Sequence, residues 1–173
     1  MFSQIILVGF AGAGKSTIGR KIAARIGWSF IDLDVAIEEY YHMEIPCFFK
    51  KYGEENFRMC EHEVLKQNLN KRNTVLSTGG GTPCFYNNMD LIIESGLTIY
   101  IKMSPASLLQ RLANSKKIRP FTQGKTPEEI KNYIDATFLE RESFYNKAHL
   151  HIKGENITMQ HLIDNRYLVA PYE

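Results

Sequence analysis

The sequence predicts an α/β fold in which helices flank a parallel sheet of five strands. Two observations predict this class. Short apolar runs alternate with helical stretches along the chain, and the first apolar run leads through a glycine-rich loop into a helix. This alternation is typical of a doubly wound sheet. At 173 residues, the chain is expected to form a single domain, residues 1–173, with a substantial core.

The first strand and the first helix enclose a loop suited to binding an anion. Residues 5–8 are apolar and largely β-branched, as in a strand that is buried on both faces. A helical period begins at Lys15, and its apolar face is formed by Ile18, Ile22 and Ile26. The loop therefore lies between a strand end and a helix start, where unpaired N–H groups and the helix dipole attract negative charge.

This loop also carries a specific motif. The spacing from Gly9 to Ser16 fits the phosphate-binding P-loop, G-x-x-x-x-G-K-[ST]. In that motif the lysine, Lys15, reaches the β- and γ-phosphate oxygens, and the Ser16 hydroxyl binds Mg²⁺. The phosphates would be cradled by the backbone amides of Gly12, Ala13, Gly14, Lys15, Ser16 and Thr17. A chance glycine-rich turn is the alternative, but the strand–loop–helix context favours nucleotide binding.

The remaining elements follow from the same alternation. Strands are expected near residues 4–9, 29–32, 74–78, 97–102 and 148–152. Helices are expected near residues 15–26, 33–41, 46–70, 86–95, 104–113, 126–145 and 159–168. Three prolines stand where helices begin, a position that tolerates a missing N–H group: Pro46, Pro105 and Pro127.

Two stretches interrupt the alternation. Residues 77–83 place three consecutive glycines, Gly79, Gly80 and Gly81, directly after a predicted strand. We interpret them as a close backbone approach to a ligand, because one or two glycines suffice for a tight turn. Residues 113–129 are polar, basic and rich in turn formers. They fit a mobile lid that carries Arg119 and an ordinary exposed loop equally well.

Two aspartates follow the second predicted strand. Residues two apart on an extended segment project to the same side, so Asp32 and Asp34 are both expected at the ligand edge of the sheet. One carboxylate beside a P-loop holds Mg²⁺ through its waters, and a second accepts or orients the proton of an attacking hydroxyl. Capping of the following helix is the alternative for one of them, but it does not account for both.

Arginines provide candidate anion-binding groups. Arg58 and Glu61 lie three residues apart in a helical stretch, so they form either an exposed ion pair or a guanidinium held in place for an anionic substrate. Arg141 is open to the same two interpretations. From the spacing alone, the ordinary exposed position is the expected one for both arginines.

Composition argues against several kinds of partner. Hydrophobic residues make up 44% of the chain, charged residues 23%, and the net charge is +2, which calls for neither a nucleic-acid nor a membrane partner. The N-terminal apolar run is too short to span a bilayer and lacks the basic start of a signal peptide. A cytoplasmic location is therefore the default expectation, and so is a monomer, because the sequence offers no clear interface patch.

Taken together, the motifs resemble those of the shikimate kinase family. The members of this family are P-loop kinases that act on a small metabolite and are related to nucleoside monophosphate kinases. The matching segments are a G-x-x-G-x-G-K-S-T loop, D-x-D, F-R-x-x-E, the triple glycine and the R-P of the lid, and "ERESFYNKA" is similar to the family's R-x-x-x-Y segment. The resemblance implies a three-layer P-loop kinase fold, with a substrate-binding region at about residues 33–61 and a mobile lid at about residues 113–125.

The resemblance also implies an activity, the ATP-dependent and Mg²⁺-dependent phosphorylation of the 3-hydroxyl of shikimate, on the route to chorismate and the aromatic amino acids. It implies catalytic roles for Asp34, Lys15 and Arg119, and metal binding by Ser16 and Asp32. Shikimate would be bound by Asp34, Arg58, Gly79, Gly80, Gly81 and Arg141, with Glu61 positioning Arg58. Arg119 would close over the phosphates with the lid, and Arg111 would lie against the adenine.

Three other classes of protein share the P-loop. One is a module that only senses ATP, and the presence of Asp32, Asp34 and Lys15 argues against it. A nucleotide-dependent switch would need N-K-x-D and D-x-x-G motifs, and the chain has neither. A kinase of another small hydroxylated metabolite, such as gluconate, would not require the combination of Arg58, the triple glycine and Arg141.

Overall fold

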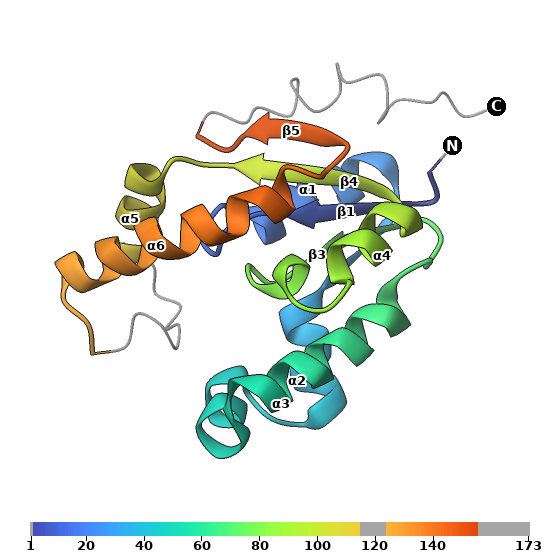
Figure 1. Ribbon diagram of the computed structural model, residues 1–173. Helices are drawn as coiled ribbons and strands as arrows, with labels where there is room; N and C mark the ends of the chain where they lie inside the picture. The colour runs from blue at the N-terminus through green and yellow to red at the C-terminus, as the bar shows by residue number, and fades with distance from the viewer. Residues whose placement is uncertain (1, 115–123, 156–173) are drawn as a thin grey trace.

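The computed structural model describes residues 2–114 and 124–155. Its centre is a five-stranded sheet with the strand order β2-β3-β1-β4-β5 (Figure 1). The strands are β1 (Gln4–Val8), β2 (Ser29–Asp32), β3 (Thr74–Ser77), β4 (Leu97–Lys102) and β5 (Leu150–Lys153). Every pair of neighbouring strands is parallel, so the five carboxyl ends meet at one edge of the sheet.

Helices connect the strands and cover the sheet. They are α1 (Lys15–Ile26), α2 (Leu33–Tyr41), α3 (Ile45–Asn68), α4 (Asn88–Ser95), α5 (Pro105–Ala113) and α6 (Pro127–Tyr145), with a short 3₁₀ helix η1 (Thr82–Cys84) before α4. In Figure 1, α1 lies behind the sheet, and α4 and α6 lie in front of it. The predicted three-layer α/β fold is therefore confirmed.

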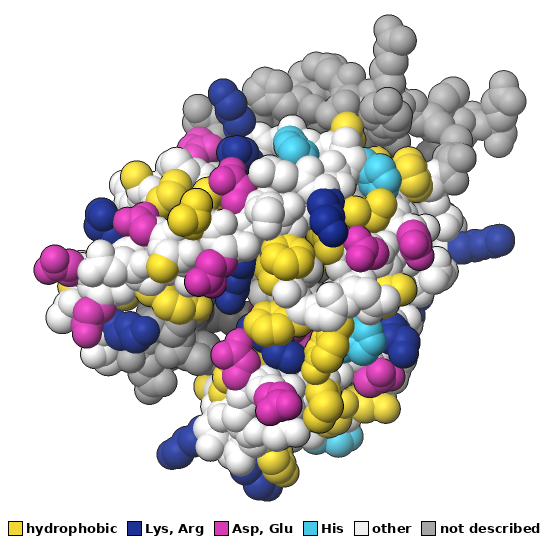
Figure 2. Space-filling model, in the orientation of Figure 1, with side chains coloured by type: hydrophobic (Ala, Val, Ile, Leu, Met, Phe, Trp, Pro, Cys, Tyr) yellow, Lys and Arg dark blue, Asp and Glu magenta, His cyan; other side chains and the backbone are white. Residues whose placement is uncertain are grey.

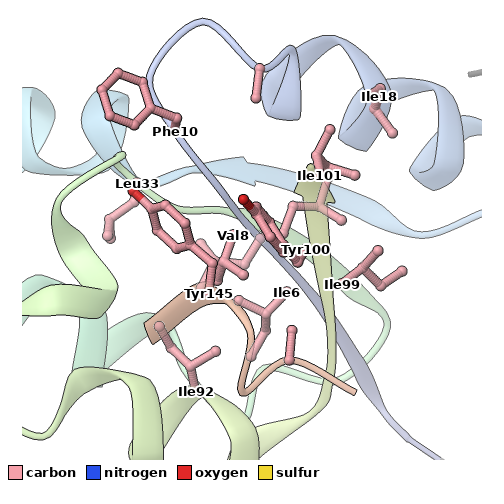
Figure 3. Packing of buried hydrophobic residues seen from close by; sticks show 14 of the residues in the cluster. Ile6, Val8, Phe10, Ile18, Leu33, Ile92, Ile99, Tyr100, Ile101 and Tyr145 are labelled. Carbon is pink, nitrogen blue, oxygen red and sulfur yellow. The ribbon is translucent and has the colours of Figure 1, made fainter. Parts of the chain in front are cut away.

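The core is centred on the two inner strands β1 and β4. Ile6 and Val8 of β1, and Ile99 and Ile101 of β4, have no solvent exposure (Figure 3). Helices on both faces remove these strands from water, which explains why their sequences are continuous apolar runs rather than alternating ones. The packing holds the carboxyl end of β1, and thus the loop that follows it, in a fixed place.

Most predicted elements are confirmed within two or three residues, and the largest difference lies in α3. The predicted helix 46–70 runs from Ile45 to Asn68 and is kinked at Gly53, whose φ of 79° and ψ of 175° are open almost only to glycine. The predicted helix 86–95 begins at Asn88 because η1 occupies residues 82–84. The predicted helix 159–168 and most of the predicted lid lie outside the described residues.

The surface carries mixed charge. On the face shown in Figure 2, acidic and basic side chains are interspersed, in keeping with the small net charge of +2. Within residues 2–114 and 124–155, none of the helices combines the length and the apolar character that crossing a bilayer requires.

Candidate active site

A cleft of about 260 Å³ opens at the carboxyl edge of the sheet. Three neighbouring strands contribute to it, because β1 leads into the P-loop, β3 into the triple glycine and β2 into the aspartates. Its walls are formed by Ala11, Gly12, Gly14, Lys15, Ser16, Thr17, Asp32, Asp34, Thr78, Gly79, Gly80, Arg111 and Leu112. The structure therefore brings the P-loop, both aspartates and two of the three glycines into one cavity.

The P-loop holds its lysine close to its own backbone. The Lys15 ammonium donates hydrogen bonds to the carbonyl oxygens of Gly9, at 2.7 Å, and Phe10, at 3.0 Å, and only 7% of the residue is exposed. Ser16 and Thr17, in the first turn of α1, line the same cavity. A positive side chain at the N-terminus of a helix favours the binding of an anion at this end of the cleft.

Ser16 Oγ lies 3.3 Å from Ser77 Oγ, the last residue of β3. Ser77 pairs in register with Asp32 of β2, so hydroxyl and carboxylate oxygens gather on one side of the P-loop. Oxygen ligands of this kind suit Mg²⁺, which keeps several waters and takes few groups from the protein. Residues 2–114 and 124–155 contain no cluster of three or more His, Cys, Asp or Glu side chains that could hold a metal ion.

The two aspartates occupy different structural positions. Asp32 caps α2, since its Oδ1 accepts a hydrogen bond from the Asp34 N–H at 3.2 Å, and Asp34 lies in the first turn of the helix. The residue that caps α2 is therefore Asp32 and not Asp34. The extended segment expected to carry both aspartates ends at Asp32, the last residue of β2. Both carboxylates still line the cleft, because the helix starts at its edge. The Asp34 carboxylate faces Gly79, whose Cβ, if present, would lie 3.2 Å from Oδ1.

Arg58 is held by two carboxylates. Its Nη1 donates to Glu61 at 2.7 Å, and its Nη2 donates to Glu54 at 2.9 Å. The Arg58 side chain is 10% exposed and that of Glu61 is 1% exposed, so the alternative of an exposed surface pair is wrong. The guanidinium also lies 4.1 Å from the centre of the Phe85 ring. Arg58 is thus fixed in orientation before any ligand binds.

Glu61 has a second partner, the Thr82 hydroxyl, which donates to it at 2.5 Å. Burial raises the pKa of Glu61, whereas the charge of Arg58 and the hydrogen bonds from Thr82 and Arg58 oppose this rise. With both of its oxygens hydrogen-bonded, the buried carboxylate is compensated and serves to hold Arg58.

The three glycines are required by neighbouring groups of the protein itself. A Cβ on Gly80 would lie 2.7 Å from the Ala11 backbone nitrogen, and one on Gly81 would lie 2.7 Å from Arg58 Nη2. The glycine segment, Gly79–Gly81, therefore packs between the P-loop and Arg58. The close approach that the structure shows is to other parts of the protein, and the predicted approach to a ligand stays a prediction. Gly79 and Gly80 also line the cleft, whereas Gly81 does not.

Two further arginines of the predicted site lie on α5 and α6. Arg111 lines the cleft and donates to the carbonyl oxygens of Ala13, at 3.3 Å, and Gly154, at 3.1 Å. Arg141 is half-buried on α6, with its guanidinium 5.9 Å from the centre of the Phe10 ring. Burial raises the pKa of the Cys84 thiol to about 11, and the positive charges of Arg141 and Arg58 both oppose this rise. Arg119 lies outside the described residues.

Comparison with known proteins identifies the family. The family model "Shikimate kinase" matches residues 11–169, which is most of the chain. This protein belongs to the shikimate kinase family.

Individual relatives agree. A shikimate kinase from Azobacteroides pseudotrichonymphae is 44% identical over 94% of this chain and 96% of its own. The crystal structure of shikimate kinase from Bacteroides thetaiotaomicron superposes with a TM-score of 0.91 at 34% identity, covering 96% of this chain and 99% of that one. A shikimate kinase from Acinetobacter baumannii, solved in complex with shikimate, superposes with a TM-score of 0.83 at 32% identity. The superposition covers 97% of this chain and 92% of that one. The switch-protein and gluconate-kinase alternatives are therefore set aside.

Within this shikimate kinase fold, the sequence analysis did not predict the contacts of three side chains at the site, although one of them, Tyr145, belongs to the R-x-x-x-Y segment. Thr82 supports Glu61, Glu54 holds Arg58, and the Tyr145 hydroxyl donates to the Gly80 carbonyl oxygen. Glu54 stands four residues before Arg58 on one helix, a spacing that could have predicted the pair. Thr82 and Tyr145 reach partners in other segments, and no local pattern marks such contacts.

Proposed function

We infer that this protein transfers the terminal phosphoryl group of ATP to the 3-hydroxyl of shikimate, the reaction of the family to which the chain belongs. The observation that carries the inference is the match to the family over residues 11–169. The geometry supports it, since one cleft joins a P-loop to two aspartates, and the buried Arg58 lies against the glycine wall. ATP and shikimate would thus meet across the Gly79–Gly81 segment.

The P-loop is proposed to hold the phosphates of ATP. The amides of residues 12–17 would donate to phosphate oxygens, and Lys15 would exchange its carbonyl partners on Gly9 and Phe10 for the β- and γ-phosphates. We propose that Arg111 lies against the adenine and that Arg119 adds positive charge over the phosphates. Phosphoryl transfer depends mainly on such positioning and neutralisation of charge.

Ser16 and Asp32 are proposed to hold Mg²⁺. Both line the cleft and offer oxygen atoms, which suit this ion. When bound, Mg²⁺ neutralises the phosphate oxygens between which charge shifts during transfer. Asp32 would bind the ion while its Oδ1 accepts the capping hydrogen bond of α2, and this hydrogen bond fixes the direction of the carboxylate.

At the other end of the cleft, we propose that Asp34 binds the 3-hydroxyl and accepts or orients its proton. The hydroxyl oxygen forms a bond to the γ-phosphorus as the bond to ADP breaks, and the proton passes towards the Asp34 carboxylate. Arg58 and Arg141 would bind the carboxylate of shikimate, with Glu61 positioning Arg58, and Gly79, Gly80 and Gly81 would form the wall of the subsite. The proposal also includes a monomeric, cytoplasmic enzyme whose partners are ATP and shikimate, with no nucleic acid or membrane.

An assay of ADP release tests the function. Purified protein with ATP and Mg²⁺ should release ADP when shikimate is added, and the Lys15→Ala variant serves as the control for contaminating kinases. Chelation of Mg²⁺ should abolish the release. Equal release with gluconate in place of shikimate would reject the substrate assignment.

A further inference from the structure

Tyr145, the last residue of α6, makes a buried contact that none of the roles above uses. The residue has no solvent exposure, and its hydroxyl donates a hydrogen bond of 2.5 Å to the Gly80 carbonyl oxygen. Figure 3 shows Tyr145 in the core, with its ring beside that of Tyr100. Burial raises the pKa of Tyr145 far above the ordinary tyrosine value, so the phenol stays protonated and remains a donor.

The two ends of this hydrogen bond belong to different parts of the site. Gly80 lines the cleft and packs against Ala11 of the P-loop. Tyr145 stands one helical turn after Arg141, and the Arg141 guanidinium is close enough to the phenol to oppose the rise of its pKa. This hydrogen bond therefore connects α6, the helix that carries Arg141, directly to the glycine wall of the cleft.

The neighbouring Tyr100 supplies a natural comparison. Its ring centre lies 5.2 Å from that of Tyr145, and it is equally buried, at 1% exposure. Yet the Tyr100 hydroxyl is the one buried side-chain polar atom without a hydrogen-bond partner among the residues described. Of these two neighbouring phenols, the Tyr145 hydroxyl is hydrogen-bonded to the glycine segment, and the Tyr100 hydroxyl has no partner among the residues described.

We propose that Tyr145 is a positioning residue for the shikimate carboxylate. Through its bond to Gly80 it sets the distance between Arg141 and the wall formed by Gly79 and Gly80. Arg141 would bind shikimate and not ATP, so Tyr145 governs the affinity for shikimate and leaves the phosphate end of the cleft alone. The inference rests on the proposed function, in which Arg141 binds the substrate carboxylate.

The test compares Tyr145→Phe with Tyr100→Phe. Each change removes one buried oxygen from the same pair of rings and keeps the volume of the side chain. We expect Tyr145→Phe to raise the KM for shikimate about 3- to 10-fold, the range of one net hydrogen bond, with the KM for ATP and kcat within about twofold of the parent. Tyr100→Phe should leave all three constants unchanged. Melting temperatures of both variants report any loss of folding.

A rescue separates positioning from packing. With p-aminophenylalanine at position 145, an N–H donor returns to the Gly80 carbonyl, and the KM for shikimate should return to within about twofold of the parent value. The proposal is overturned if Tyr145→Phe lowers only the melting temperature, if it lowers kcat with the KM for shikimate unchanged, or if the amino variant binds shikimate as poorly as Phe. A parent protein that shows no shikimate-dependent ADP release would instead contradict the proposed function.

Discussion

Asp32 and Asp34 show how two identical side chains, two residues apart, come to occupy different structural positions. Asp32 ends β2 and has its Oδ1 committed to the Asp34 N–H. Asp34 lies within the first turn of α2, where the helix dipole favours its negative charge, and its carboxylate faces Gly79. A carboxylate in that place can meet a substrate hydroxyl, whereas the capping carboxylate is tied to the backbone.

Replacement of Asp34 by Asn tests this division. Asn cannot accept the hydroxyl proton, so kcat should fall by about 100-fold or more, the usual contribution of general base catalysis. The cap on α2 is made by Asp32 and the backbone of residue 34, so the free energy of unfolding should change by less than about 1 kcal/mol. Steady-state kinetics and urea unfolding measure the two quantities. Near-normal turnover would remove Asp34 from the chemistry.

At the scale of the element, the two parts of α3 on either side of its kink make different contacts. The part before Gly53 packs beside α2, with Phe48 and Tyr41 in ring contact. The part after Gly53 carries Glu54, Arg58 and Glu61 at helical spacings that bring all three together. The kink lets one continuous segment both pack against α2 and hold Arg58 between Glu54 and Glu61.

Replacement of Gly53 by Ala isolates the cost of that kink. No atom lies within 4 Å of the place a Cβ would take, so the change acts through backbone strain alone. Strain at such a backbone conformation exceeds the gain from a stiffer unfolded chain, and we expect a net loss of about 1–2 kcal/mol in the free energy of unfolding. Urea denaturation measures the loss. Glu55→Ala, at an exposed helical position nearby, is the matched control and should stay within about 0.5 kcal/mol. Equal stability of the two variants would show that the kink stores no strain.

At the scale of the whole molecule, the strand order builds the site. Because β3 lies between β1 and β2, the glycine segment after β3 stands between the P-loop and the aspartates. The P-loop and the glycine segment are therefore in direct backbone contact, at Ala11 and Gly80. Ligands that fill the cleft should bridge segments drawn from the whole chain and so stabilise the folded state.

Thermal unfolding tests this coupling. At a concentration 100 times its Kd, a ligand that binds only the folded state adds about 2.7 kcal/mol, which for a chain of this size corresponds to a rise of about 5–10 °C in Tm. We expect such a rise with Mg²⁺-ATP and a separate rise with shikimate. Gluconate should leave Tm unchanged, and an equal shift with gluconate would argue against a site specific for shikimate.

Local patterns in the chain were enough to predict the P-loop, the class of the fold and nearly every helix and strand, because each depends on residues that are close together in sequence. The motif set also carried the resemblance to shikimate kinases. Three-dimensional packing alone decided that the Arg58–Glu61 pair is buried, and that Thr82 and Tyr145 form hydrogen bonds to Glu61 and Gly80. The physical reason is distance along the chain: Tyr145 and Gly80 are 65 residues apart, and only the folded sheet brings donor and acceptor together.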